Sequence, residues 1–340
     1  MSARPGPAAV LGAGSWGTAL ANLLAGRGLD VRLWSHSAEV AEQINREREN
    51  RVYLEGIPLE DRVHATTELA AALDGAAAVV CATPSHVARE ILERARPAIA
   101  AGTLLVNAAK GIEVDTLLTL SHVIRSVLPD ATPVTLSGPS FAREVAQGHP
   151  TAVVAASDVP EAAQHVQTLF STARFRVYTN DDLTGVELAG SLKNVIALAT
   201  GVVEGLEYGH NTRAALLTRA LAEITRLGVA MGARARTFAG LAGMGDLILT
   251  CTGGPSRNRA VGLQLARGHP LAEVLRGMRM VAEGVNTTKA ALRLAARHDV
   301  EVPIIQEVHA FLFEGKSPDQ AVEDLMVRKL KPEHWGIRDA

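Results

Sequence analysis

Short apolar runs alternate with stretches of helical periodicity through the first half of the chain. Most of these runs are apolar throughout, which is typical of parallel strands covered on both faces. The ranges expected to form strands are Ala8–Leu11, Asp30–Trp34, Ala77–Cys81, Thr103–Asn107, Val134–Leu136, Thr151–Ala155 and Phe175–Tyr178. Helices are expected between many of them, for example at Ser15–Ala25, His86–Ala95 and Pro160–Phe170. This order predicts an α/β domain with a doubly wound, mostly parallel sheet that binds ligands at the carboxyl ends of its strands.

The pattern changes after about Thr184, where helical periodicity continues without a convincing strand. The helices expected there are Gly185–Leu206, Arg213–Met231, Ala260–Arg267, Leu271–Gly277, Asn286–His298 and Ile304–Phe313. A chain of 340 residues is also long for a single core. We therefore predict two domains, an α/β domain over residues 1–184 and an all-α domain over residues 185–340.

A glycine-rich loop follows the first predicted strand and opens the first predicted helix. It reads Gly12-Ala13-Gly14-Ser15-Trp16-Gly17, a G-x-G-x-x-G pattern in the strand–turn–helix context that gives it meaning. Its first glycine allows the turn, the second lets the backbone approach a pyrophosphate, and the third lets helix and strand pack closely. The helix N-terminus then faces the phosphates with free N–H groups and a partial positive charge. The first domain is therefore expected to be Rossmann-type, with NAD or NADP as the cofactor.

The end of the second predicted strand carries no acidic residue. An Asp or Glu at this point normally binds the adenosine ribose hydroxyls and would repel the additional phosphate of NADP. Here the chain reads Trp34-Ser35-His36, so NADP is tolerated, and Arg32 and His36 are candidates to contact that phosphate. A solvated turn is the alternative for both residues, and the preference between NADH and NADPH stays open.

Charge and composition exclude several other classes of protein. The formal net charge of −2 argues against a protein built to bind nucleic acid or an anionic membrane. No apolar run is predicted to be long enough to span a bilayer, and the start of the chain lacks the pattern of a signal segment. Cys81 and Cys251 are isolated, and no Cys/His cluster has metal-ligand spacing, so we expect buried free thiols and no metal. A cytoplasmic enzyme with a small-molecule substrate is the expected class.

Two loops after predicted strands have residues suited to a ligand. Lys110 follows a buried strand, where its compact charge suits a phosphate or a polarised carbonyl, although a solvated lysine is the alternative. The segment Ser137–Ala142 consists mostly of small residues, which leave backbone N–H groups and hydroxyls available to a ligand or to a helix cap.

Lys193 lies in the most apolar predicted helix of the chain. Burial of a lysine is unfavourable and lowers its pKa toward neutrality, unless the side chain reaches solvent from the helix edge. An enzyme that reduces a carbonyl needs a proton donor beside the oxygen that hydride attack makes basic. Lys193 is the candidate for that donor, and Asn194 could hold the ligand or the lysine in place.

Two further segments of the helical half carry polar groups of interest. Asp246 lies between glycines and an apolar run, so a buried carboxylate there needs a cation or hydroxyl partner, for example Lys193. The run Ser256–Arg259 leads into a predicted helix, with its serine as the expected cap. Arg257 and Asn258 in this run are candidates to bind a phosphate. Arg259 is instead a candidate to pair with a carboxylate.

Taken together, these segments resemble the NAD(P)-dependent glycerol-3-phosphate dehydrogenases of bacteria. The motifs run in the family's order from Gly12 to about Pro303. They are GAGSWGTALA at Gly12–Ala21, ATPSH at Ala82–His86, KG at Lys110–Gly111, SGPSFA at Ser137–Ala142, LKNVIA at Leu192–Ala197, GMGDLILTC at Gly243–Cys251, SRNR at Ser256–Arg259 and VAEGV at Val281–Val285.

The resemblance implies a function and a role for each matching residue. The implied reaction is reversible reduction of dihydroxyacetone phosphate to sn-glycerol 3-phosphate, which supplies glycerophospholipid synthesis, with the substrate held between the two domains. Lys193 would be the proton donor for reduction and the acceptor for oxidation. The implied substrate-binding residues are Lys110, Gly138, Ser140, Lys193, Asp246, Ser256, Arg257 and Asn258. The implied cofactor-binding residues, with the glycines of the loop, are Ser15, Trp16, His36, Lys110, Ala142, Arg257, Val281 and Glu283.

Two other functions compete with this interpretation. A β-hydroxyacid dehydrogenase of the 3-hydroxyisobutyrate or 6-phosphogluconate type also combines a Rossmann-type domain with a helical domain and a lysine in an apolar helix. The Ser256–Arg259 and Gly243–Asp246 segments have the glycerol-phosphate form instead. A non-catalytic nucleotide sensor would have no need of Lys110, Lys193 and Asp246 in this arrangement. The sequence leaves open the oligomeric state, a homodimer included, and feedback control.

Overall fold

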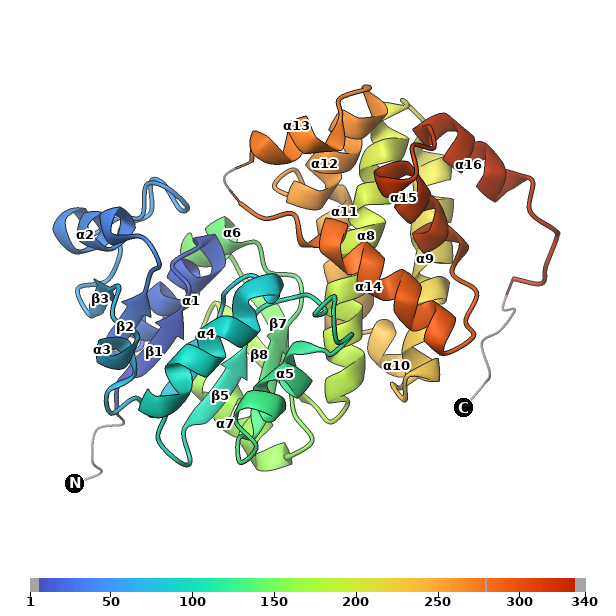
Figure 1. The fold of residues 1–340 in the computed structure, drawn as a ribbon. Coiled ribbons are helices and arrows are strands. Elements are labelled where there is room, and N and C mark those ends of the chain that lie inside the picture. The colour runs from blue at the N-terminus through green and yellow to red at the C-terminus, as the bar shows by residue number, and fades with distance from the viewer. Residues whose placement is uncertain (1–5, 279, 334–340) are drawn as a thin grey trace. The chain divides into compact units, whose positions relative to one another are not determined.

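The computed structural model describes residues 6–278 and 280–333 and divides the chain into two compact units (Figure 1). The first unit consists of residues up to Ala109 together with Leu120–Leu183, and the second consists of Lys110–Thr119 together with the residues from Thr184 onward. The predicted domains differ from these units at Lys110–Thr119, which the prediction assigned to the first domain. These ten residues group with the helical unit because Ile112 and Leu117 are buried in its hydrophobic core.

The first unit is built on one eight-stranded sheet in the order β3-β2-β1-β4-β5-β6-β7-β8. Its strands are β1 Ala8–Leu11, β2 Val31–Trp34, β3 Val63–Thr66, β4 Ala78–Cys81, β5 Leu104–Asn107, β6 Pro133–Ser137, β7 Thr151–Ala156 and β8 Phe175–Asn180. All neighbouring strands are parallel except β6 and β7, which are antiparallel. Each predicted strand is present, and the mostly parallel sheet is confirmed. The prediction missed β3, because its Val-His-Ala-Thr sequence is half polar at the edge of the sheet.

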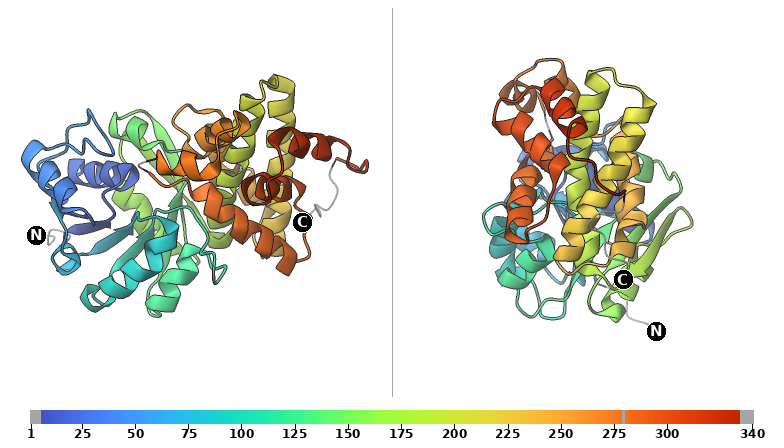
Figure 2. Two further views of the ribbon diagram at one scale, coloured as in Figure 1. Left: turned by 45° about the horizontal axis from the view of Figure 1, so that its top comes forward. Right: turned by 90° about the vertical axis from the view of Figure 1, so that its right-hand side faces the viewer.

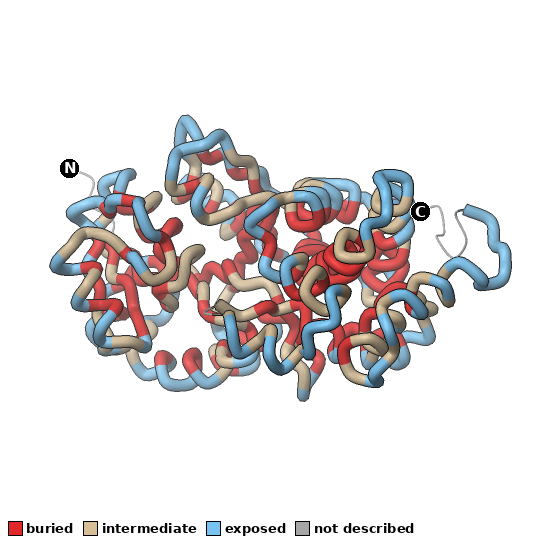
Figure 3. The backbone as a smooth tube through the Cα atoms, turned by 90° about the horizontal axis from the view of Figure 1, so that it is seen from above, coloured by how far each residue is buried: buried red, intermediate tan, exposed pale blue. Residues whose placement is uncertain are grey.

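Helices cover this sheet on both faces, since β1 and β4 are buried at every position. The helices of this unit are α1 Ser15–Gly26, α2 Ala38–Glu47, α3 Leu69–Leu73, α4 Ala88–Ala95, α5 Leu120–Val127, α6 Ala142–Ala146 and α7 Pro160–Phe170. Leu20 and Leu24 of α1 pack with Val10, Val80 and other strand residues in one buried cluster. Figure 3 shows buried stretches of backbone in red and exposed stretches in pale blue.

The second unit contains helices and no strand among its described residues, as predicted. The helices are α8 Leu183–Gly205, α9 His210–Ala230, α10 Ala235–Phe238, α11 Asp246–Thr252, α12 Arg257–Ala266, α13 Leu271–Arg276, α14 Glu283–Arg297, α15 Pro303–Phe313 and α16 Pro318–Met326. A π-helical turn at Leu241–Gly245 leads into α11. The long helices α8 and α9 lie side by side (Figure 2), and their apolar residues share a core with α14 and α15.

Helix α8 corrects one expectation from the sequence. Its 23 residues include an 18-residue window with a mean hydropathy of 1.4, which is long and apolar enough to cross a bilayer, so the expectation that no run has this length is wrong. All of its most apolar 18-residue window is buried inside the unit. This burial makes α8 a core helix around which the other helices pack.

A buried glutamate joins α9 to the start of α15. The two carboxyl oxygens of Glu223 accept hydrogen bonds from the N–H groups of Ile304 and Ile305, both at 2.9 Å. These N–H groups lie in the first turn of α15, where no carbonyl of the helix itself can accept a hydrogen bond from them. Burial raises the pKa of Glu223 to about 7, although the two N–H groups and the Arg226 guanidinium act in the opposite direction.

This raised pKa predicts a pH-dependent stability. The folded chain binds the Glu223 proton more tightly than the unfolded chain, in which this carboxyl has its ordinary pKa of 4.5. The contribution of Glu223 to the stability of the fold therefore falls as pH rises between 4.5 and about 7. Glu223→Gln should remove up to about 3 kcal/mol of that decline, as measured by urea unfolding between about pH 5 and 8. Glu273→Gln, an exposed change on α13, is the control. Equal pH slopes for wild type and Glu223→Gln would contradict the prediction.

Candidate functional site

The glycine loop at the carboxyl end of β1 fits a dinucleotide. Gly12 has a φ of +116°, and a Cβ there would lie 2.9 Å from the carbonyl oxygen of Ala82. At Gly17 a Cβ would overlap the carbonyl oxygen of Gly12, so the close contact between loop and helix needs both glycines. Gly14 is different: it forms the N-cap of α1 without a side-chain cap, and a Cβ there would have no neighbour within 4 Å. This leaves open space beside a helix N-terminus, where a pyrophosphate binds favourably.

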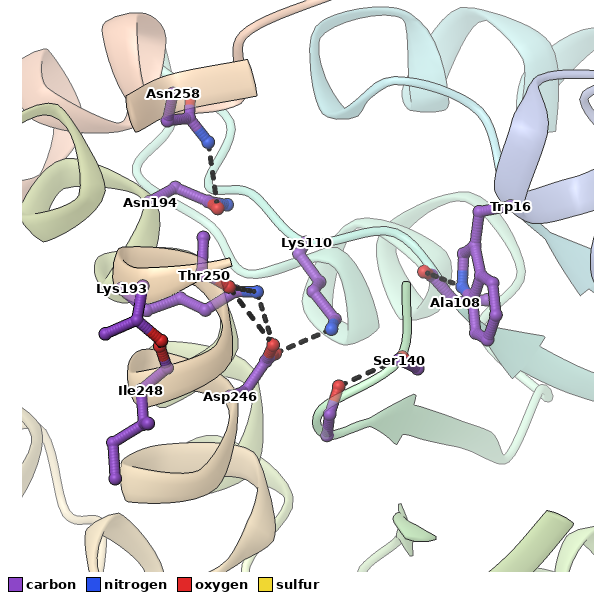
Figure 4. A network of polar contacts seen from close by, with 12 residues as sticks. Trp16, Ala108, Lys110, Ser140, Lys193, Asn194, Asp246, Ile248, Thr250 and Asn258 are labelled. Carbon is purple, nitrogen blue, oxygen red and sulfur yellow. Dashed lines mark hydrogen bonds and ion pairs between the residues drawn. The ribbon is translucent and has the colours of Figure 1, made fainter. Parts of the chain in front are cut away.

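Three of the residues singled out in the sequence as candidates to contact the cofactor have defined surroundings in the structure. Trp16 donates from Nε1 to the carbonyl oxygen of Ala108 at 3.2 Å (Figure 4), and both Trp16 and Ala142 pack against a small buried cluster that contains Ala19. His36 is exposed just beyond the end of β2. Arg32, the other candidate for an NADP phosphate, donates to the carbonyl oxygen of Ala71 at 3.0 Å and to that of Asp74. Of the two, His36 therefore remains the better candidate.

The loop after β6 is shaped by a second glycine. Gly138 has a φ of +137°, and a Cβ there would lie 2.9 Å from the Cα of Val153. Ser140 donates from Oγ to the carbonyl oxygen of Gly138 at 3.0 Å (Figure 4). This hydrogen bond holds the loop in a compact turn at the carboxyl end of β6, where α/β sheets bind ligands.

In the second unit, two lysines share one buried carboxylate (Figure 4). The Lys193 Nζ lies 2.5 Å from Asp246 Oδ1, and the Lys110 Nζ lies 2.6 Å from Asp246 Oδ2. Lys193 also donates to Thr250 Oγ1 at 2.6 Å. The side chains of Asp246 and Lys193 are 1% and 7% exposed, while that of Lys110 is 18% exposed. The expected pairing of Lys193 with Asp246 is confirmed, and the alternative that Lys193 reaches solvent is wrong.

The electrostatics of this cluster favour proton exchange near neutral pH. Burial lowers the pKa of Lys193 from 10.5 to about 8, and the nearby Lys110 charge lowers it further, while Asp246 opposes both effects. The expected shift toward neutrality is confirmed. Thr250 was not predicted from the sequence as a site residue, although it stands one helical turn after Asp246 on α11 and so lies on the same face.

The N-terminus of α12 is capped as the sequence predicts. Ser256 is the N-cap, and its hydroxyl accepts from the N–H of Arg259 at 3.3 Å. Arg259 pairs with Glu204 of α8, which confirms a carboxylate partner for this arginine. The cap and ion pair hold the first turn of α12 against the core, so that Arg257 and Asn258 begin a rigid helix.

Arg257 and Asn258 both contact the segment that begins α14. Arg257 donates from Nη1 to the carbonyl oxygen of Val281 at 2.8 Å. Burial lowers the pKa of its guanidinium, which the Glu283 charge opposes. Asn258 accepts from the N–H of Gly284 at 2.9 Å and donates from Nδ2 to Asn194 Oδ1 at 3.0 Å (Figure 4). Much of the Asn258 amide is therefore used to join α8, α12 and α14, a connection that the sequence did not reveal.

The comparisons with known proteins agree with this chemistry. The family model for the N-terminus of NAD-dependent glycerol-3-phosphate dehydrogenase matches residues 7–163, and the model for its C-terminus matches residues 182–323. A glycerol-3-phosphate dehydrogenase (NAD(P)+) of Geobacter sulfurreducens is 55% identical over 329 residues, which are 96% of this chain and 98% of that protein. The corresponding protein of Desulfotalea psychrophila is 50% identical over 331 residues, with 96% and 98% covered.

Solved structures give the same result. The glycerol-3-phosphate dehydrogenase of Coxiella burnetii superposes with a TM-score of 0.92 at 41% identity, covering 95% of this chain and 99% of that one. The Saccharomyces cerevisiae enzyme superposes with a TM-score of 0.81 at 27% identity, covering 96% and 100%. These matches decide against the β-hydroxyacid and sensor alternatives. The chain belongs to the NAD-dependent glycerol-3-phosphate dehydrogenase family, oxidoreductases that interconvert dihydroxyacetone phosphate and sn-glycerol 3-phosphate with NAD(P) as cofactor.

Proposed function

We propose that Lys193 is the general acid when this chain reduces dihydroxyacetone phosphate, and the general base in the reverse reaction. The observation that carries this role is the buried Lys193 ammonium, held at 2.5 Å by Asp246 and at 2.6 Å by Thr250. The bound nicotinamide cofactor supplies the hydride for reduction and accepts it for oxidation. Lys193 supplies the proton that the substrate oxygen then needs, and with a pKa of about 8 it is mostly protonated at neutral pH.

Asp246 orients this acid and balances its charge. Its two oxygens hold the Lys193 and Lys110 ammonium groups at 2.5 and 2.6 Å, so both cations are fixed before a ligand arrives. Lys110 is the more exposed of the two lysines and is proposed to contact substrate and cofactor. Preorganised charges of this kind stabilise the oxygen that becomes negative as the carbonyl is reduced.

The substrate's phosphate is proposed to bind at the start of α12. An N-terminal turn with a guanidinium favours a phosphate group. The residues proposed to contact substrate are Lys110, Gly138, Ser140, Lys193, Asp246, Ser256, Arg257 and Asn258. Those proposed to bind the cofactor are Gly12, Gly14, Ser15, Trp16, Gly17, His36, Lys110, Ala142, Arg257, Val281 and Glu283.

The setting of this activity is also a proposal. A cytoplasmic enzyme without nucleic acid or membrane partners is proposed, and the near-neutral net charge of −2 supports the absence of nucleic acid. The product, glycerol 3-phosphate, would supply glycerophospholipid synthesis. A homodimer is the oligomeric state to test first, by light scattering of the purified protein.

Discrimination by the phosphate group tests the proposed clamp. We expect wild type to oxidise NADH or NADPH with dihydroxyacetone phosphate and to use unphosphorylated dihydroxyacetone far less well. Arg257→Ala should raise KM for the phosphorylated substrate by about thirtyfold or more, because a charge-assisted contact of roughly 2 kcal/mol is lost. Its activity on dihydroxyacetone should change much less. Absorbance of the reduced cofactor measures both.

The control for this experiment is Arg267→Ala, an exposed arginine at the other end of α12. An unchanged KM in Arg257→Ala would remove this residue from the clamp. No oxidation of either cofactor by folded wild type would overturn the assigned reaction. Comparing the ratio of the rates with NADH and NADPH between wild type and His36→Ala shows whether His36 contacts the additional phosphate of NADP.

A further inference from the structure

We propose that Ile112, Leu117 and Arg293 form an anchor that positions Lys110 in the site. The anchor holds residues 110–119, here called the Lys110 hairpin, against the helical unit. None of the three anchor residues is placed in contact with substrate or cofactor, so they are positioning residues. The inference rests on the role proposed above for Lys110.

The Lys110 hairpin is closed by its own backbone. Ile112 and Thr119 form an isolated antiparallel bridge. Within it, Glu113 donates from its N–H to the carbonyl oxygen of Leu118 at 3.0 Å, and Leu117 donates to that of Glu113 at 2.9 Å. The hairpin therefore has a defined shape, and its placement depends on how it is held from outside.

Two apolar side chains of the hairpin are buried in the hydrophobic core of the helical unit. Ile112 and Leu117 are 1% and 7% exposed and belong to the same buried cluster as Leu192 and Val195 of α8 and Leu294 of α14. Leu117 adopts a φ of +63°, a left-handed backbone conformation that a leucine rarely takes. Such a conformation persists only where the surrounding structure enforces it. Burial of the Leu117 side chain is the interaction that does so here.

A polar contact holds the turn of the hairpin. Arg293, on the exposed side of α14, donates from Nη1 to the carbonyl oxygen of Val114 at 2.6 Å. Charge-assisted hydrogen bonds of this kind are stronger than neutral ones. The hairpin is thus held by apolar contacts at its sides and by a guanidinium at its turn.

The position of the hairpin decides how Asp246 is shared. Lys110 is its first residue, and its ammonium takes one Asp246 oxygen while Lys193 takes the other. The charged or titratable groups that act on Lys193 are Asp246, Lys110 and the Cys251 thiol. If the hairpin loosens, Lys193 keeps Asp246 to itself and loses the repulsion of Lys110. Its proton is then held more tightly, and the ligand loses a cation that was fixed in advance.

The test compares anchor variants with a direct change at Lys110. We expect Leu117→Ala to raise KM for dihydroxyacetone phosphate about tenfold, and Arg293→Ala about threefold. Both should move the alkaline decline of kcat/KM for reduction upward by about half a pH unit. Arg297→Ala, an exposed arginine one turn further along α14, should change neither quantity. Lys110→Met should shift both in the same direction and by more.

A double variant separates positioning from general damage. With Lys110 already removed, the anchor has nothing to position, so Lys110→Met/Leu117→Ala should match Lys110→Met in KM and in pH profile. Additive effects, or anchor variants with wild-type kinetics, overturn the inference while leaving the role of Lys110 intact. If Lys110→Met has the KM and the pH profile of wild type, the proposed role of Lys110 is overturned, and so is the function of the anchor. If Leu117→Ala does not fold, Arg293→Ala carries the same comparison, because it removes one surface hydrogen bond.

Discussion

Replacing Lys193 with methionine is expected to lower kcat for reduction of dihydroxyacetone phosphate by at least about a hundredfold. Methionine fills a similar volume in the buried site but cannot donate a proton, so the loss is one of acid catalysis and not of packing. The affinity for NADH should stay close to wild type. Steady-state kinetics gives kcat, and quenching of tryptophan fluorescence gives the dissociation constant of the cofactor.

The pH dependence of wild type provides an independent check on Lys193. Because reduction needs the protonated amine, kcat/KM for reduction should fall as pH rises through about 8, and kcat/KM for oxidation should rise over the same range. Both changes of kcat/KM with pH, the alkaline limb of the reduction profile and the rise for oxidation, should be absent in Lys193→Met. Lys193→Arg keeps a positive charge, but a guanidinium does not release its proton near neutral pH, so this variant should also be slow. A residual rate above about a tenth of wild type in either variant would refute acid–base catalysis by this residue.

Asp246→Asn is expected to have a comparably large effect, on activity and on stability together. The change leaves two ammonium groups beside a neutral amide in a buried site, where loss of one ion-pair partner destabilises by about 3–5 kcal/mol. Without the carboxylate, the pKa of Lys193 falls below about 8, since Asp246 no longer opposes the effects of burial and of Lys110. Less of the acid is protonated at neutral pH, and kcat/KM for reduction should fall at least about a hundredfold.

Three measurements separate these consequences. Urea unfolding gives the loss of stability, with Asp319→Asn as an exposed control at the start of α16. The alkaline limb of the reduction profile should move to lower pH, opposite to the direction expected for Lys110→Met. Asp246→Glu keeps the charge and should retain the wild-type limb with a reduced rate. A limb that moves upward in Asp246→Asn would show that the carboxylate does not hold the Lys193 proton.

Local sequence was sufficient for most of the sheet and for the cofactor loop. Strands buried on both faces must be apolar throughout, which is why β1 and β4 were recognisable from their residues alone. The strand β3 has a polar residue at every second position because it lies at the edge of the sheet, and edge position is a property of the assembled fold. The glycines at positions 12 and 17 were likewise readable, since only glycine permits such close backbone approach.

The ion pair of Lys193 and Asp246 was also predictable, because the burial of a single charge is so unfavourable that each residue implied an opposite partner. The roles of Thr250 and Gly284 were not predictable, since a threonine on a helix and a glycine in a helix's first turn have many ordinary roles. Asn258 carried a ligand-binding expectation, yet the structure also gives its amide a role in joining three helices.

The chain's own pattern thus determined most of the strands and helices, the loop proposed to bind a dinucleotide, and which charges must be paired. Only the tertiary structure decided that the Lys110 hairpin belongs to the helical unit and that one carboxylate serves two lysines. The physical reason is the range of the interactions. Backbone geometry and apolar periodicity act between near neighbours in the chain, whereas Lys110 and Asp246 are 136 residues apart and meet only through packing.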